Sequence, residues 1–240
     1  MELHKQIVNW IRTQVKKSDK KGLVFGLSGG IDSAVVCALS KLAVGENALG
    51  LILPCKSAPR DVELALKVAK KFGVKTKKVV LDRIFDALVK IYPKAGHLAK
   101  SNLKPRLRMA VLYYFANILD YLVVGTGNKS ELAVGYFTKH GDGGVDILPL
   151  GGLLKTEVRV LARSLSIPHE IIDRPPSAGL WPGQTDEGEM DITYDELDKI
   201  ITAVENEQTK GVDKRNLLKV NKMMAYSEHK RCKTPVFNKN

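Results

Sequence analysis

Apolar and polar positions alternate along the chain with two different periodicities. Apolar residues recur at helical spacing between Leu3 and Val15, which predicts an amphipathic helix at the start. Short, nearly continuous apolar runs predict buried strands over 22–27, 48–53, 75–81 and 121–126. Helical spacing returns between and after these runs, over 32–44, 61–72, 82 to about 90, 105–119, 193–205 and 214–226, with a short helix near Ser130. Gly73 is expected to end the helix over 61–72.

Strands that alternate with helices predict an α/β fold: a single-domain, doubly wound parallel sheet flanked by helices, of the Rossmann-like kind, with right-handed crossovers. Ligands bind such sheets beyond the carboxyl ends of the strands. The loops that follow 22–27 and 121–126 are therefore candidate site loops. Two segments, 92–105 and 173–191, are rich in Gly, Pro and polar residues and are expected to be long loops that are either disordered or functional.

Chain length and net charge limit the number of domains and the kinds of partner that are expected. A chain of 240 residues can bury one sizeable core but is too short for two full enzyme domains, so one domain over 1–240 is expected. Lysine and arginine (38) outnumber aspartate and glutamate (26), and the net charge of +12 favours an anionic partner. That partner is nucleic acid, a membrane surface or a polyphosphate nucleotide, and lysines also raise solubility without any partner.

The cysteines and the N-terminus indicate a compartment. Cys37, Cys55 and Cys232 are far apart and form no CxxC pair, which argues against a zinc knuckle or a disulfide framework. The first residues carry charge throughout and lack an apolar signal core, and no apolar run approaches the ~20 residues needed to cross a bilayer. A cytoplasmic protein without a membrane partner is therefore expected.

The sharpest chemical signal is the hexapeptide Ser28-Gly29-Gly30-Ile31-Asp32-Ser33, between a predicted strand and a predicted helix. Its glycines allow a tight turn that brings backbone N–H groups close to phosphate oxygens, and the next helix adds its positive dipole end. Asp32 would repel a phosphate, but it fits a Mg²⁺ ion held between carboxylate and phosphate. The hexapeptide is neither a Walker A sequence nor GxGxxG. A simpler alternative is a strand–helix turn in which Asp32 or Ser33 caps the helix.

This hexapeptide and its setting resemble the signature of the PP-loop ATP pyrophosphatases, the adenine nucleotide α-hydrolase-like group. The resemblance implies an enzyme that cleaves ATP between the α and β phosphates and transfers AMP to a substrate oxygen. It leaves the acceptor open.

A second candidate segment follows the strand predicted over 121–126. Glu131 lies near a helix start, where its carboxylate either reaches a metal shared with Asp32 or simply favours the helix dipole. The glycine-rich run 135–146 either wraps a ligand or forms a flexible surface loop. Tyr136 and Phe137, at its start, either stack on a ring or anchor the core.

Seven segments together resemble the NH3-dependent NAD synthetase family. They are GLSGGIDSA, KPRLRM, GTGNKSE, GYFTKHGDGGVDILPL, LLKTEVRVLA, RPPSAGLWPGQTDE and SEHKR, in family order from 26 to 231. Other PP-loop families share the first segment but not FTKHGDGG or the SAGL-QTDE loop. The acceptor that the resemblance implies is deamido-NAD.

Resemblance also implies the roles of individual residues. ATP would be bound by Gly26, Leu27, Ser28, Gly29, Gly30, Ile31, Asp32, Ser33, Thr126, Lys155 and Ser177. Mg²⁺ would be held by Asp32 and Glu131, and deamido-NAD by Arg106, Lys139, Asp146, His229 and Lys230. Lys155 suits the β and γ phosphates as a point charge. Ser177 stands where many members carry threonine, and the hydroxyl is retained.

The implied reaction is ATP- and Mg²⁺-dependent amidation of deamido-NAD by ammonia, through an acyl adenylate, with release of AMP and pyrophosphate. Lys155 and the ion held by Asp32 would stabilise charge on the departing pyrophosphate, and Asp146 would orient or deprotonate ammonium. No glutaminase domain is expected, so the nitrogen comes from free ammonia or from another polypeptide. Members of the family are typically homodimers.

Two other classes of protein are alternatives to this family. A tRNA-modifying PP-loop enzyme would explain the basic charge, but it usually needs an added RNA-binding domain, and none is visible; no nucleic-acid partner is therefore expected. A non-enzymatic nucleotide-binding module of the same fold would bind ATP without releasing pyrophosphate, and the retained Asp32 and Glu131 argue against it.

Overall fold

Four parallel strands form the sheet at the centre of the computed structural model, which describes residues 2–181 and 183–238. They are β1 (Gly22–Gly26), β2 (Ala48–Ile52), β3 (Lys75–Lys78) and β4 (Tyr121–Val124), in the order β3-β2-β1-β4. Leu23 of β1 lies opposite Ala48 on one side and Leu122 on the other. The chain winds first toward β3 and then returns to place β4 beside β1, so the direction of winding changes at β1.

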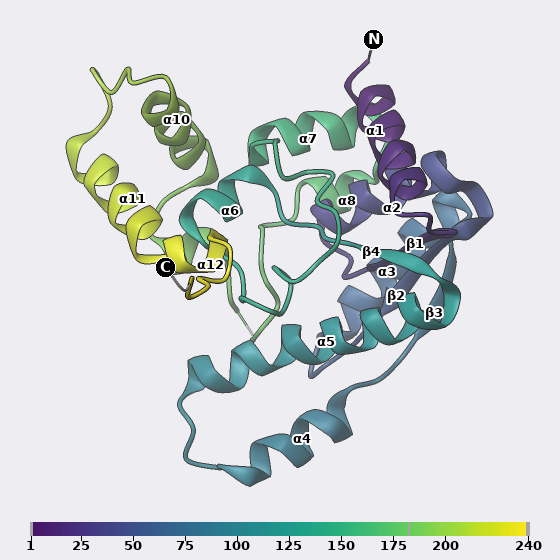
Figure 1. The fold of residues 1–240 in the computed structure, drawn as a ribbon. Helices are drawn as coiled ribbons and strands as arrows, with labels where there is room; N and C mark the ends of the chain where they lie inside the picture. Colours follow the sequence, from purple (N-terminus) through teal and green to yellow (C-terminus); the bar gives the residue numbers. More distant parts are fainter. Residues whose placement is uncertain (1, 182, 239–240) are drawn as a thin grey trace.

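Helices cover both faces of this sheet (Figure 1). Side chains of β1 point alternately to the two faces, so Leu23 and Phe25 join one core cluster while Val24 joins the other. The first cluster contains buried residues of α1 (Leu3–Lys17), α2 (Ile31–Val44), α3 (Pro59–Phe72), α7 (Lys155–Ser164) and α8 (His169–Ile172). The second contains buried residues of α5 (His97–Leu119), beside α4 (Asp82–Ile91). The predicted doubly wound α/β fold is confirmed.

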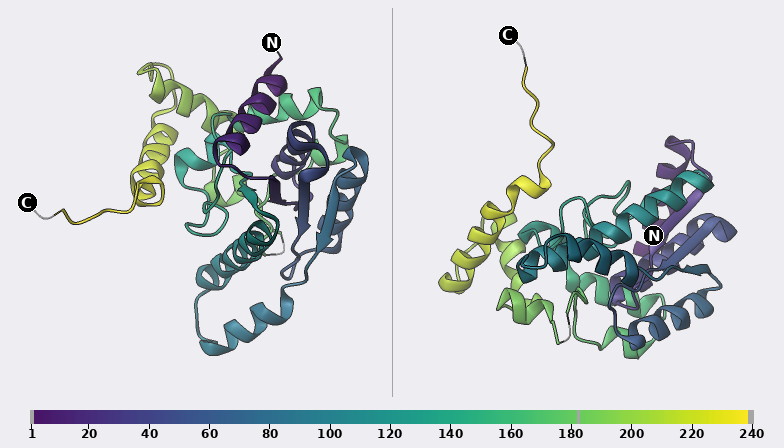
Figure 2. Two further views of the ribbon diagram at one scale, coloured as in Figure 1. Left: turned by 45° about the vertical axis from the view of Figure 1, so that its right-hand side comes forward. Right: turned by 90° about the horizontal axis from the view of Figure 1, so that it is seen from below.

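A smaller helical unit lies beside the sheet and encloses a third core cluster around Tyr194, Leu197 and Ile201. Its helices are α6 (Lys129–Val134), α9 (Asp186–Met190), α10 (Tyr194–Glu205), α11 (Lys214–Tyr226) and α12 (Glu228–Arg231). The chain then extends away from the body over 233–238 (Figure 2). Within the described ranges, no helix has both the length and the apolar character to span a membrane.

Two predicted boundaries were wrong by three or more residues. The strand predicted over 75–81 ends at Lys78, because its partner β2 ends at Ile52. The helix predicted from Pro105 begins at His97, so most of the predicted loop 92–105 is helical and Pro105 lies inside a helix. Proline removes one N–H donor there, but burial of the preceding turn, with Ser101 and Lys104, outweighs this local preference.

Helix α7 was not predicted, although its sequence carries a helix signal. Val158, Leu161 and Ala162 are buried at helical spacing. The Glu157 carboxylate also accepts a hydrogen bond from the backbone N–H of Leu154, at 2.8 Å, which caps the helix start. This helix matters because Lys155 is its first residue.

Candidate active site

A cavity of about 540 Å³ opens beyond the carboxyl ends of β1, β2 and β4. Parallel sheets bind ligands at this edge, beside the strand where the winding direction changes. Loops after all three strands, one side of α5 and the segment 174–181 line the cavity. Its lining includes these predicted residues: Gly26, Leu27, Ser28, Gly30, Ile31, Asp32, Ser33, Thr126, Glu131, Lys155, Ser177, His229 and Lys230.

The loop after β1 is held in a tight turn by its own hydroxyl groups. The Ser28 N–H donates to Ser33 Oγ at 3.2 Å, and the Gly30 N–H donates to Ser28 Oγ at 3.2 Å. Gly29 has φ +84°, in the left-handed region, and packs directly on the first turn of α3. Helix α2 begins at Ile31 with Gly30 as its N-cap and no capping side chain, so the simpler alternative of a side-chain cap is wrong. The helix start is free to face a ligand.

Gly29→Ala is expected to weaken ATP binding by at least about ten-fold, because a side chain there is strained in two ways. A Cβ on Gly29 would lie 2.5 Å from the Asp61 carbonyl oxygen, and the left-handed φ itself disfavours alanine. Gly152→Ala is the matched control, since a Cβ there meets no atom within 4 Å. Calorimetric titration with ATP checks the effect; an unchanged affinity in Gly29→Ala would show that the loop does not bind the nucleotide.

A cluster of opposite charges lies beside this loop. The Lys155 ammonium donates to Asp32 Oδ2 at 2.6 Å and to Glu131 Oε1 at 3.1 Å. The Lys155 side chain is 2% exposed and each carboxylate 16%. Burial by itself lowers the pKa of Lys155, but the charges of Asp32 and Glu131 outweigh burial and raise it. Burial raises the pKa of Glu131 to about 7, against the opposing charge of Lys155.

Helix starts position the members of this cluster. Glu131 Oε2 accepts from the Asn128 N–H at 3.2 Å and Asn128 Oδ1 accepts from the Glu131 N–H at 3.0 Å, a capping box that begins α6. Glu131 therefore caps its helix and contacts Lys155 with its other oxygen. Asn128 also donates to Asp32 Oδ1 at 3.0 Å, which joins α6 to α2. Asp198 of α10 accepts from the Thr156 N–H at 2.9 Å and so fixes the first turn of α7.

The same carboxylates suit a magnesium ion that arrives with a triphosphate. Asp32 and Glu131 converge on one cationic atom, Lys155 Nζ, so both point toward a common position. Mg²⁺ in nucleotide sites is held by one or two carboxylates, with phosphate oxygens and waters completing its shell. The donor set therefore fits this ion.

The segment 174–181 closes one side of the cavity. Arg174 pairs with Asp61 of α3 at 2.7 Å. The Leu180 carbonyl accepts from the buried Lys104 ammonium of α5 at 2.6 Å. Ser177, the predicted ATP contact, lies between these two attachments. The predicted loop 173–191 is thus tied down in the described structure, and its last part forms α9.

Two of the predicted deamido-NAD residues, His229 and Lys230, come from the short helix α12. The Lys230 ammonium donates to the Gly135 and Phe137 carbonyls at 2.8 and 3.0 Å. The Lys139 ammonium donates to the His229 carbonyl at 2.6 Å. These lysines have neutral partners here, unlike Lys155, so their charges are available to an anionic ligand.

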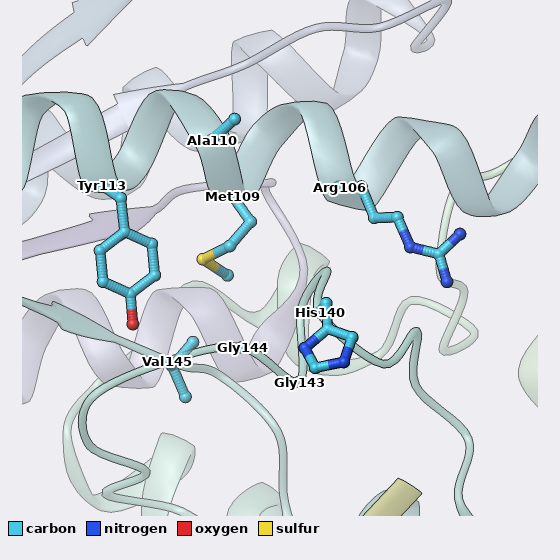
Figure 3. Close-up of a pocket in the computed structure, with 8 residues that line it drawn as sticks. All are labelled: Arg106, Met109, Ala110, Tyr113, His140, Gly143, Gly144 and Val145. Atoms are coloured by element: carbon cyan, nitrogen blue, oxygen red, sulfur yellow. The ribbon is translucent and has the colours of Figure 1, made fainter. Parts of the chain in front are cut away.

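Of the other two, Arg106 lines a shallow groove between α5 and the loop over 140–145, and Asp146 directly follows that loop. Figure 3 shows Arg106, Met109 and Tyr113 pointing from α5 toward the loop that carries His140. Asp146 accepts from the Tyr113 hydroxyl at 3.0 Å and from the Val123 N–H at 2.7 Å. The structure therefore does not gather these two residues with Lys155, and their assignment to deamido-NAD stays a prediction.

Some cavity residues escaped the sequence analysis. Arg108, Asp142 and Asp186 line the cavity, and each lies inside one of the quoted family segments, which was the available signal. Arg108 donates to the Leu53 carbonyl at 3.1 Å, and burial lowers its pKa. Tyr194 lies under the Lys155 ammonium, 4.9 Å from ring centre to nitrogen, and no quoted segment contains it.

Comparison with known proteins gives consistent results. The NAD synthase family model matches residues 3–234. An NH(3)-dependent NAD(+) synthetase from Finegoldia magna is 47% identical over 231 residues, which cover 96% of this chain and 93% of that protein. The corresponding synthetase from Archaeoglobus fulgidus is 47% identical over 234 residues, covering 96% and 94%.

Solved structures agree with the sequence matches. The structure of an NMN synthetase from Francisella tularensis has a TM-score of 0.92 at 36% identity and covers 98% of this chain and 97% of its own. An NH3-dependent NAD synthetase from Campylobacter jejuni, in complex with the nitrate ion, has a TM-score of 0.87 at 28% identity and covers 99% and 100%. With similarity that extends over nearly the whole chain, in sequence and in fold, the chain belongs to the NAD synthase family.

Proposed function

We propose that this chain makes NAD from deamido-NAD, ATP and ammonia, and releases AMP and pyrophosphate. The observation that carries the proposal is the meeting of Lys155, Asp32 and Glu131 beside the phosphate loop, at the switch point of the sheet. This arrangement suits a triphosphate and its metal. The family of the chain supplies the acceptor, a pyridine carboxylate.

In the first step, the carboxylate of deamido-NAD attacks the α-phosphorus of ATP, and the bond to the β-phosphate oxygen breaks. Backbone amides of the phosphate loop and the start of α2 hold the phosphates in line with the attacking oxygen. The Lys155 ammonium lies where it can turn from its carboxylates to the departing pyrophosphate. Mg²⁺, held by Asp32 and Glu131, would supply further positive charge for the pyrophosphate.

In the second step, ammonia attacks the acyl carbon of the adenylate, the bond to the AMP oxygen breaks, and the nitrogen loses a proton. AMP leaves with an oxygen that came from the carboxylate. Water would hydrolyse the adenylate, so the segment 174–181 has a protective role on one side of the cavity. We propose that Asp146 either accepts the proton that the nitrogen loses or orients the ammonium ion.

Ammonia is the nitrogen donor in this proposal. The chain covers 93% of the Finegoldia magna relative, which is named for ammonia, but only 47% of a glutamine-dependent NAD+ synthetase from Acinetobacter baumannii that shares its fold at 29% identity. This chain therefore matches nearly the whole of a relative named for ammonia and less than half of the glutamine-dependent enzyme. Pure protein should form NAD with ammonium chloride and give no product with glutamine; turnover with glutamine alone would contradict this part.

A shorter acceptor is the second candidate. The NMN synthetase of Francisella tularensis is more similar in fold and identity than the Campylobacter jejuni NAD synthetase. Parallel assays with deamido-NAD and with its mononucleotide, followed by mass detection of NAD and NMN, decide between them. A higher kcat/KM for deamido-NAD supports the first candidate, and a higher value for the mononucleotide replaces it with the second.

We further propose a homodimer that works in the cytoplasm. Ile84 and Ile91 of α4 and Tyr114 and Ile118 of α5 expose large apolar side chains, which a second copy would cover. Ile118→Glu should convert a dimer into a monomer, as light scattering during gel filtration would show; a monomeric wild-type protein would contradict the dimer. Free cysteines among the described residues fit a reducing compartment.

A further inference from the structure

Asp186, the first residue of α9, is a buried carboxylate that no step of the proposed reaction uses. It is 4% exposed, whereas Asp191, which caps the other end of α9, has a side chain that is 81% exposed. A buried charge is costly unless hydrogen bonds satisfy it, so its partners indicate what it holds in place.

One set of partners brackets Ser177. The Asp186 N–H donates to the Pro176 carbonyl at 2.9 Å, and Asp186 Oδ1 accepts from the Ala178 N–H at 2.9 Å. Pro176 and Ala178 are the two chain neighbours of Ser177. Asp186 therefore fixes the backbone on both sides of Ser177. The Ser177 residue lines the cavity and is a predicted ATP contact.

The other oxygen of Asp186 faces the charged cluster. Asp186 Oδ2 accepts from the Tyr194 hydroxyl at 3.0 Å, and that hydroxyl lies 3.4 Å from Glu131 Oε1. The Tyr194 ring is fully buried and lies under the Lys155 ammonium. A continuous path of contacts therefore runs from the Ser177 backbone through Asp186 and Tyr194 to Glu131 and Lys155.

We infer that Asp186 is a positioning residue. It holds Ser177 directly and the Lys155–Glu131 pair through Tyr194, so that the two sites lie at the separation needed to bind one triphosphate. The inference deepens the proposed function and rests on it for the identity of the nucleotide. Ser177 and Lys155 are 22 positions apart in the sequence, and no hydrogen bond joins them in the described structure. A shared support therefore places them around one ligand.

The experiment measures equilibrium binding of a non-hydrolysable ATP analogue with Mg²⁺ to the full chain. Asp186→Ala removes the carboxylate contacts with Ala178 and Tyr194 but keeps the backbone contact with Pro176. It should weaken binding about ten-fold, the effect of losing one well-placed charged hydrogen-bond partner. Asp186→Asn keeps an oxygen for the Ala178 N–H and should recover affinity to within about three-fold of wild type. Asp191→Asn, at the residue that caps the other end of α9, is the control and should bind as wild type.

Tyr194→Phe and the double variant test the path. If Asp186 acts through Tyr194, the double variant should bind no more weakly than Asp186→Ala by itself, whereas independent effects would add. Binding of deamido-NAD should change less than about two-fold in every variant, because none of the residues predicted to hold it forms a hydrogen bond with Asp186 or Tyr194 in the described structure. In a Trp10→Phe background, Trp181 fluorescence should report a more exposed segment in Asp186→Ala.

Unchanged analogue affinity in Asp186→Ala would overturn the inference. Equal loss of affinity for both nucleotides would also overturn it, since that pattern indicates a general structural role. The result is separate from the proposed reaction: protein that binds the analogue through Asp186 but makes no NAD leaves this inference standing while the proposed function fails.

Discussion

Lys155→Met is expected to slow pyrophosphate release from ATP by about a thousand-fold, the upper range for removing one preorganised donor to a developing charge. The Lys155 ammonium lies 2.6 Å from Asp32 and 3.1 Å from Glu131, beside the phosphate loop. Without it, two carboxylates face an incoming triphosphate and the departing pyrophosphate loses a partner. Methionine replaces the apolar part of the lysine side chain and ends one atom short of the ammonium nitrogen, so packing of that part changes little.

Lys129→Met is the matched control, because Lys129 is the first residue of α6 as Lys155 is the first residue of α7. Its ammonium pairs with Glu205 on the surface at 2.5 Å, and such a pair adds little stability. Pyrophosphate release by this control should stay near the wild-type rate. A Lys155→Met rate within about ten-fold of wild type would remove Lys155 from the reaction.

Lys155→Met should also change how the stability of the folded state depends on pH. Glu131 has a folded pKa of about 7 against an ordinary value of 4.5, so the folded state holds its proton more tightly than the unfolded chain does. Stability from such a group is present at low pH and is lost as the pH rises through the folded pKa. Since the charge of Lys155 lowers the pKa of Glu131, Lys155→Met should raise that pKa further. Its melting temperature should therefore fall more steeply than that of wild type between about pH 5 and 8.

Asp32→Asn is expected to reduce adenylation by about a thousand-fold or more, because it removes a charge that pairs with Lys155 and that would hold the proposed metal ion. Asp32 is the second residue of α2 and also accepts a hydrogen bond from Asn128 at 3.0 Å. Asparagine keeps the size and one oxygen but binds a divalent cation weakly. The Mg²⁺ concentration that gives the half-maximal rate should rise as the rate falls.

Asp195→Asn provides the control for this change. Asp195 is the second residue of α10, is exposed, and pairs with Arg159 at 3.2 Å on the surface. It should show wild-type rates and the wild-type Mg²⁺ dependence. If Asp32→Asn kept the wild-type Mg²⁺ dependence, Asp32 would not be a metal ligand.

The sequence predicted the strand, loop and helix that carry Asp32. A continuous apolar run indicates a buried strand, and two adjacent glycines indicate a tight turn. The position of the cavity also followed from the alternation of strands and helices. The approach of Lys155 to Asp32 joins residues 123 positions apart. Residue type alone did not indicate that approach; the family segments did, and tertiary packing produces it.

Other features had no decisive local signal. Pro105 reads as a helix start, but tertiary packing extends α5 back to His97. Tyr194 reads as an ordinary core residue, and it is one, yet its hydroxyl reaches Asp186 and its ring lies under Lys155. Such double roles depend on which helices pack against one another. The periodicity of a single sequence does not reveal that packing.

The central claim is that this chain adenylates the carboxylate of deamido-NAD. The most direct test is whether an oxygen atom of that carboxylate is transferred to AMP. Deamido-NAD labelled with oxygen-18 in its pyridine carboxylate is incubated with the purified chain, ATP, Mg²⁺ and ammonium chloride. Mass spectrometry should find one labelled oxygen in each AMP formed and the other in the amide of NAD. Unlabelled AMP, or labelled NAD formed without AMP, would show that the carboxylate does not attack the α-phosphorus.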